Sequence, residues 1–204
     1  MTVNPIAPGS GSRAPKRRSG ESVSRLVKAA AAGDERGWNA LVEEFSGLLW
    51  AVARAHRLPA ADAADVVQAT WLRLLEHLQR LQDPSRVGAW LATTARRESL
   101  RLLRESERAV PFGDDAPELE SDAIAPDDVL LGRERDDALW RSVACLRPSD
   151  QALLRLLVAD SEPSYEEIAA ALDMPIGSIG PTRQRALQRL RGELDAASLA
   201  LMTA

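Results

Sequence analysis

The sequence predicts an all-α protein of two small helical domains joined by an extended acidic linker. Three observations support this prediction. Apolar residues recur at helical spacing over long stretches with few β-branched runs. Residues 109–132 contain no Lys or Arg but carry seven acids and three prolines, as expected of an extended segment. Residues 164–191 follow with a helix-turn-helix pattern whose second helix is rich in arginine.

Composition and charge narrow the classes of function. The 204 residues carry a net charge of −4, so any DNA contact must come from local basic patches or from a basic partner. Cys145 is the only cysteine and the histidines, His56 and His77, lie far apart, which argues against a disulfide framework and familiar zinc spacings. No metal or cofactor is therefore expected.

Two further classes are disfavoured by what the sequence lacks. It shows no paired catalytic carboxylates, no nucleophile with a base and no Gly-rich phosphate loop, so an enzyme is not expected. It also has neither an apolar run of membrane-spanning length nor a secretory segment, so we expect a cytoplasmic protein that does not enter the membrane.

Shifts in composition divide the chain into five segments. The predicted order is a disordered basic tail at 1–22, a helical domain at 23–108, the acidic linker at 109–132, a second helical domain at 133–197 and a short apolar tail at 198–204.

Three helices are predicted in the first domain, and the first two have clear inward stripes. Asp34 caps the first helix, which ends before Pro59 and buries Trp38, Leu41, Val42, Phe45, Leu49 and Val52. Asp62 opens the second, which runs to about Leu81 and buries Val67, Trp71, Leu74, Leu78 and Leu81. Its opposite face is a polar row with one leucine, formed by Asp65, Gln68, Leu72 and Glu76. This row fits either docking on another protein or simple solvation.

The third helix is predicted from Val87 to Arg108 and carries a cationic ridge. Trp90 and Leu91 face inward, whereas the ridge comprises Arg96, Arg97, Arg101 and Arg104. Such a ridge suits a phosphate backbone. The alternative is a surface helix whose arginines pair at i,i+4 spacing with Glu98, Glu105 and Glu107.

The helix-turn-helix begins with a capping box. Ser164 and Glu167 place the start of its first helix near Tyr165. A turn over 173–177 contains Pro175, and Ser178 is expected to cap the second helix. That helix turns Ile179, Ala186 and Leu190 inward, and Pro181, Gln184, Arg185, Gln188 and Arg191 outward. The outward face suits the DNA major groove, but an ordinary hairpin with a solvated basic face has the same pattern.

The order of these segments resembles the extracytoplasmic-function (ECF) class of the sigma-70 family of bacterial RNA polymerase sigma factors. The resemblance covers roughly residues 23–195, and its most specific motifs are DVVQATWLR at 65–73 and YEEIA followed by PIGSI within 165–179. It implies a factor that binds core RNA polymerase, recognises the minus-thirty-five and minus-ten promoter elements and promotes DNA melting.

By this resemblance the first domain corresponds to region 2, which binds the clamp helices of the largest polymerase subunit. The polymerase contact would comprise Asp65, Gln68, Leu72, Arg73 and Glu76. A loop that captures a flipped base of the minus-ten element would comprise Gln82, Asp83, Pro84, Ser85 and Arg86. Further minus-ten contacts would come from Trp90, Arg96, Arg97, Arg101 and Arg104, although a core role for Trp90 is favoured over stacking on DNA.

The second domain corresponds to region 4, which reads the minus-thirty-five element and touches the flap of the second-largest subunit. Its DNA contacts would comprise Ser178, Gly180, Pro181, Thr182, Arg183, Gln184, Arg185 and Arg189. The family commonly has Lys-Ser-Arg at 180–182, and commonly has Asn and Asp where this chain has Arg97 and Arg101. The promoter sequence therefore cannot be taken from relatives.

The acidic linker and the overall function each fit more than one interpretation of the sequence. The linker would follow the nucleic-acid channel of polymerase and mimic RNA, or it would be a solvated tether. An anti-sigma factor would be a further partner. The two competing functions are a freestanding helix-turn-helix regulator, which would bind duplex DNA without polymerase, and a helical adaptor without DNA affinity.

Overall fold

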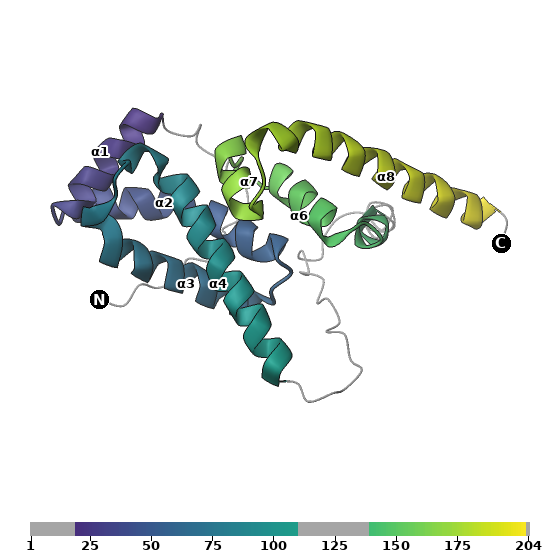
Figure 1. Cartoon of the computed structure of the whole chain (residues 1–204), viewed down its shortest axis with the longest axis horizontal. Coiled ribbons are helices and arrows are strands. Elements are labelled where there is room, and N and C mark those ends of the chain that lie inside the picture. The colour runs from purple at the N-terminus through teal and green to yellow at the C-terminus, as the bar shows by residue number, and fades with distance from the viewer. Residues whose placement is uncertain (1–18, 110–138, 203–204) are drawn as a thin grey trace, which may run out of the picture.

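The computed structural model describes residues 19–109 and 139–202. Within these two ranges every regular element is helical, which confirms the all-α prediction (Figure 1). The basic tail up to residue 18 and the acidic stretch at 110–138 lie outside the described residues, so the predictions about them remain untested. We call residues 19–109 the first block and residues 139–202 the second block.

The first block contains one helix more than the sequence analysis predicted. Its helices are α1 (Gly20–Ala31), α2 (Glu35–Ala55), α3 (Ala60–His77) and α4 (Val87–Ala109), with short 3-10 turns η1 (Leu78–Arg80) and η2 (Pro84–Arg86) before α4. Helix α1 begins inside the segment assigned to the tail, so that assignment was wrong for residues 20–22. The Ser19 hydroxyl accepts a hydrogen bond from the Ser22 amide at 3.4 Å, and Val23 and Val27 are buried.

The predicted helix starts in this block were right for α2 and wrong for α3. Asp34 caps α2 by accepting a hydrogen bond from the Arg36 amide at 2.9 Å. Helix α3 starts after Pro59, whose carbonyl accepts from the Ala63 amide at 2.9 Å. Asp62 therefore lies in the first helical turn, where its charge favours the helix dipole but makes no cap.

The inward stripes of α2 and α3 meet in the core. Leu41, Leu49 and Leu74 are fully buried, and the ring centroids of Trp38 and Trp71 lie 5.8 Å apart in an edge-to-face arrangement. Helix α3 ends at His77 rather than near Leu81, and η1 carries Leu78 into its buried position.

The second block contains a short helical stretch at 139–144, α6 (Pro148–Leu157), α7 (Tyr165–Leu172) and α8 (Ile176–Met202). The capping box is confirmed, because the Ser164 hydroxyl and the Glu167 carboxylate each receive the other residue's backbone N–H. Ser178 does not cap α8. The helix already starts at Ile176, and the Ser178 hydroxyl donates to the Pro175 carbonyl at 2.7 Å. Helix α8 also continues past residue 197, the predicted end of the domain.

The two blocks pack on each other. Helix α7 lies against α4, and α6 lies against α2 (Figure 1). Leu91 of the first block shares one buried apolar cluster with Leu153, Ile168 and Ile179 of the second. The described residues therefore form a continuous core across the two blocks.

A histidine lies at this junction and should make folding sensitive to pH. His56 Nε2 is 3.3 Å from the Ala171 carbonyl of the second block. Burial lowers the pKa of His56 below its ordinary value of 6.5; the hydrogen bond to Ala171 opposes this shift, and the positive charge of Arg96 adds to it. The unfolded chain therefore binds more protons than the folded chain just below pH 6.5.

We expect the free energy of unfolding to decline as the pH falls from about 6.5 through the lowered pKa of His56. Urea denaturation at a series of pH values measures this decline. His56→Gln should flatten the decline in this range, because it removes the group that titrates. An equal decline in wild type and His56→Gln would show that another group is responsible.

Candidate polymerase and promoter surfaces

The outward face of α3 has the exposed polar and apolar residues that the sequence predicted. Asp65, Gln68, Leu72 and Glu76 are all exposed. Leu72 is 52% exposed, and Leu75, which the sequence analysis did not single out, is 60% exposed. Two large apolar side chains beside carboxylates on one helix form a surface suited to another protein rather than to water alone.

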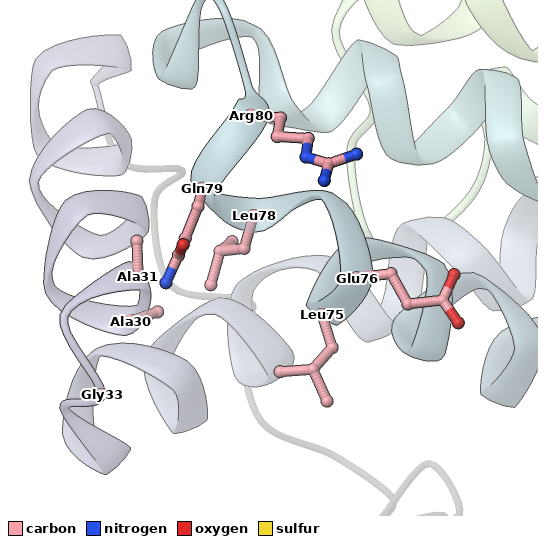
Figure 2. A pocket seen from close by; sticks show the side chains of 8 residues that line it. All are labelled: Ala30, Ala31, Gly33, Leu75, Glu76, Leu78, Gln79 and Arg80. Carbon is pink, nitrogen blue, oxygen red and sulfur yellow. The ribbon is translucent and has the colours of Figure 1, made fainter.

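A pocket extends this surface toward α1 (Figure 2). It is lined by Ala30, Ala31, Gly33, Leu75, Glu76, Leu78, Gln79 and Arg80. The small residues at the end of α1 leave room beside Leu75 and Leu78, so the outer face of α3 continues into a concave surface that has both apolar and polar side chains. This pocket could not be predicted from the sequence patterns, because they do not predict α1.

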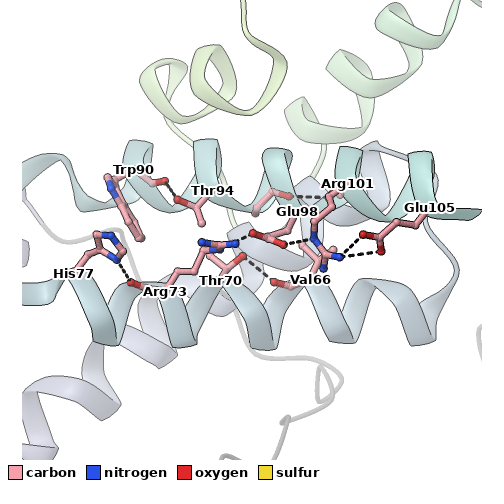
Figure 3. Close-up of polar contacts among 11 residues, drawn as sticks. Val66, Thr70, Arg73, His77, Trp90, Thr94, Glu98, Arg101 and Glu105 are labelled. Carbon is pink, nitrogen blue, oxygen red and sulfur yellow. Dashed lines mark hydrogen bonds and ion pairs between the residues drawn. The ribbon is translucent and has the colours of Figure 1, made fainter.

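Arg73, the remaining predicted polymerase contact, belongs to a different polar cluster. Its Nε donates to Glu98 Oε1 of α4 at 2.5 Å (Figure 3). Arg101 Nε donates to the other oxygen of Glu98 at 2.9 Å, and Arg101 Nη1 binds both carboxylate oxygens of Glu105 at 2.8 Å. The cluster of Arg73, Glu98, Arg101 and Glu105 thus ties α3 to α4. It also shows that Arg101 follows the i,i+4 pairing alternative.

Glu98 is the buried centre of this cluster. Its side chain is 6% exposed, whereas about half of each arginine side chain, 51% for Arg73 and 49% for Arg101, remains exposed. Burial would raise the pKa of Glu98, but the hydrogen bonds from Arg101 and Arg73 outweigh burial and hold the pKa below its usual value. Glu98 is therefore an ionised, doubly paired carboxylate at neutral pH.

The loop predicted to capture a base is an ordered turn. The Asp83 carboxylate accepts from the Ser85 amide at 3.0 Å and from the Ser85 hydroxyl at 2.5 Å, and this side-chain hydrogen bond lowers the pKa of Asp83. Gln82, Asp83, Ser85 and Arg86 are exposed and Pro84 is half-buried. The Arg86 guanidinium lies 3.8 Å from Glu166 of α7.

Some of the α4 residues predicted to contact DNA already have partners within the described residues, and others do not. Trp90 is half-buried with its ring 6.0 Å from the His77 ring, consistent with packing inside the first block. Arg96 pairs with Asp173 of the second block at 2.8 Å. Arg97 and Arg104 are exposed and have no ion pair within the described ranges. The cationic ridge predicted on α4 therefore reduces to Arg97 and Arg104.

The residues predicted on the outward face of α8 are mostly exposed. Gly180, Pro181, Arg183, Gln184 and Arg185 are exposed, and Ser178 and Thr182 are half-buried. Arg185 Nη2 donates to the Thr182 hydroxyl at 3.2 Å.

Arg189 has a structural partner that the sequence did not reveal. Arg189 Nη1 binds Asp150 Oδ2 at 2.6 Å, and Arg147 Nε binds the same oxygen at 3.1 Å. The Asp150 side chain is completely buried, so Arg189 fastens α8 to α6. A DNA contact by Arg189 stays a prediction that must coexist with this pairing.

Replacing Glu98 should cost more stability than replacing Glu105. We expect Glu98→Ala to lower the free energy of unfolding by about 2 kcal/mol, because it leaves two arginines without their buried partner. The matched change Glu105→Ala, at an exposed pair, should cost about 0.5 kcal/mol or less.

Urea denaturation of the two variants measures the difference. In wild type, the Glu98 contribution should be present at neutral pH and should be lost as the pH falls below about 4.5, because the folded-state pKa of this carboxyl is lowered. Equal losses in the two variants would contradict the central role of Glu98.

Comparison with known proteins identifies relatives along most of the chain. Residues 41–109 match the family described as sigma-70 region 2. The ECF RNA polymerase sigma-E factors of Salmonella typhimurium and Escherichia coli K12 are 27% identical over 163 residues, which is 76% of this chain and 84% of those proteins. The ECF RNA polymerase sigma factor SigL of Mycobacterium tuberculosis is 36% identical over 87 residues, which is 42% of this chain and 47% of that protein.

Solved structures show the same fold. CnrH, in complex with the cytosolic domain of CnrY, gives a TM-score of 0.59 at 23% identity and covers 86% of this chain and 98% of its own. The sigma factor RpoE of Bartonella quintana, in complex with the anti-sigma factor NepR, gives 0.57 at 25% identity and covers 78% and 96%.

Among the helices described, none is long and apolar enough to cross a bilayer. Residues 19–109 and 139–202 contain no cluster of three His, Cys, Asp or Glu side chains that could hold a metal ion.

Proposed function

Because the chain belongs to the ECF class of the sigma-70 family, whose members are non-enzymatic factors that act with RNA polymerase in transcription initiation, we propose that it directs polymerase to a specific set of promoters. In this proposal the chain acts in the cytoplasm, binds core polymerase and reads the two promoter elements. The observation that carries the proposal is the match of residues 41–109 to sigma-70 region 2.

The outer face of α3 is the proposed contact with the clamp helices of the largest polymerase subunit. Leu72 and Leu75 are exposed on this face beside Asp65, Gln68 and Glu76, and the neighbouring pocket extends it. A partner helix that covered the leucines would bury apolar surface, while the polar residues would set its orientation. Arg73, which is half exposed, would join this contact from its position beside Glu98.

Helix α4 and the loop before it are the proposed minus-ten reader. Arg97 and Arg104 offer two cations for phosphates. The exposed residues around Asp83 offer polar groups for an unpaired base, whose capture would favour DNA melting. Arg96 would contribute only after exchanging its partner Asp173, and Arg101 only after exchanging its partners Glu98 and Glu105.

The outward face of α8 is the proposed minus-thirty-five reader. Arg183, Gln184 and Arg185 project from its exposed side, as a helix in the major groove requires. Contact between this block and the polymerase flap would fix the spacing of the two readers along the promoter. The chain carries a net charge of −4, so binding to polymerase would supply the positive surroundings that it lacks.

In vitro transcription with core polymerase on genomic fragments, followed by start-site mapping, tests the proposal. We expect wild type to confer initiation at defined start sites. On a promoter found in this way, the double variant Arg97→Gln and Arg104→Gln should weaken holoenzyme binding and reduce the slope of log affinity against log salt by about 1 to 2, because two phosphate contacts are lost.

A matched pair of substitutions controls for net charge. Arg25→Gln and Arg36→Gln remove two exposed arginines from α1 and α2, and should leave the salt slope near that of wild type. Failure to confer initiation at any site would refute the proposed function. Tight binding to duplex DNA without polymerase would instead support a freestanding regulator.

A further inference from the structure

We propose that the basic residues directly before α1 form a DNA-binding arm, which begins beside the loop at 82–86 and contacts backbone phosphates next to the base that this loop captures. The arm comprises Arg13, Lys16, Arg17 and Arg18, which lie outside the described residues. Its place follows from the point at which α1 begins. The inference rests on the proposed function, because it takes the loop as part of the minus-ten reader.

The arm differs in charge from the rest of the chain. Residues 1–20 contain 4 of the 26 basic residues and none of the 30 acidic ones, so residues 21–204 carry a net charge of −8. Opposite charges attract and like charges repel over distances of about 10 Å in physiological salt. DNA that approaches the first block would therefore be attracted by the arm, whereas the average charge of the remaining chain repels it.

The start of α1 lies against the loop. A Cβ added at Gly20 would be 3.6 Å from Ser85 Cβ and 3.9 Å from the Ser85 carbonyl oxygen, which is ordinary van der Waals contact. Helix α1 and the turn η2 lie side by side (Figure 1). The segment that carries the arm is therefore joined to the described structure directly at the loop.

Both partners in this contact are held in place. Val23 and Val27 bury one face of α1, and the Ser19 hydroxyl caps its first turn. On the loop, the Asp83 carboxylate fixes Ser85 through its amide and its hydroxyl. The point from which the arm begins is therefore fixed relative to the loop.

Chain length limits where the arm can bind. An extended chain spans at most about 3.6 Å per residue, so the Cα of Arg18 lies within about 7 Å of the Gly20 Cα, and the Cα of Arg13 within about 25 Å. A distance of about 25 Å corresponds to roughly seven phosphates along one strand of B-DNA. The arm can therefore contact only phosphates close to the captured base.

The loop has little positive charge of its own to offer these phosphates. Its one arginine, Arg86, lies 3.8 Å from Glu166, and Asp83 adds a carboxylate. Along α4, the first arginine that has no ion pair with another described residue is Arg97. It follows the start of the helix at Val87 by ten residues, which is roughly 15 Å of helix. The arm would supply the cations that the neighbourhood of the captured base lacks.

Removing the two arm cations nearest the loop tests the inference in holoenzyme, on a promoter found by start-site mapping. Arg17→Gln with Arg18→Gln should weaken binding roughly threefold to tenfold at about 0.1 M salt, and should reduce the slope of log affinity against log salt by about 1 to 2. The gain from each contact is limited because a segment rich in Pro, Gly and Ser loses conformational entropy when it binds.

The matched control is Arg25→Gln with Arg36→Gln, which removes two exposed arginines from α1 and α2 and should retain the wild-type salt slope. Neither double variant alters the Ser19 cap or Gly20, so both should unfold at the urea midpoint of wild type.

Promoters that carry methylphosphonates locate the contact, because this group replaces a charged phosphate by a neutral one. Neutral phosphates in the minus-ten element should abolish the difference in affinity between wild type and Arg17→Gln with Arg18→Gln. Neutral phosphates in the minus-thirty-five element should leave that difference intact, because the arm cannot reach them.

Three results would overturn the arm as a DNA contact. The first is a salt slope for the arm variant that equals the slope of the control. The second is a difference in affinity that persists on DNA neutralised at the minus-ten element. The third is weaker binding of the arm variant to core polymerase without DNA, which would make polymerase the partner of the arm. In all three cases wild type still confers initiation, whereas failure of the proposed function would abolish initiation by wild type itself.

Discussion

The burial of α4 between other helices is the constraint on which the rest of the structure depends. This helix packs against α2 and α3 within the first block and against α7 of the second. Its charged residues must therefore find partners on the elements that cover them. Glu98 pairs with Arg73 of α3 and also with Arg101 of its own helix, and Arg96 pairs with Asp173 at the end of α7. Of the α4 arginines predicted to contact DNA, Arg97 and Arg104 are exposed and form no ion pair within the described ranges.

Local chemistry explains which parts of the fold were predictable from the sequence. The Ser164 capping box and the Asp34 cap act over three residues or fewer, so a sequence pattern contains them completely. Helix α1 was missed because its start lies within Pro-, Gly- and Ser-rich sequence, and burial of Val23 and Val27 stabilises it from outside the segment. The expected caps at Asp62 and Ser178 failed because each helix begins directly after a proline that precedes them.

The sequence predicted which helix faces of the candidate surfaces are exposed, but it did not predict which of their arginines form ion pairs. Helical spacing correctly placed the polar row of α3 and the arginines of α8 on exposed faces. It could not show that Arg189 binds Asp150, 39 residues away, or that Arg96 binds Asp173, 77 residues away. Such ion pairs depend on tertiary contacts between helices. A cationic stripe in a sequence therefore gives an upper limit to the charge that a folded surface offers.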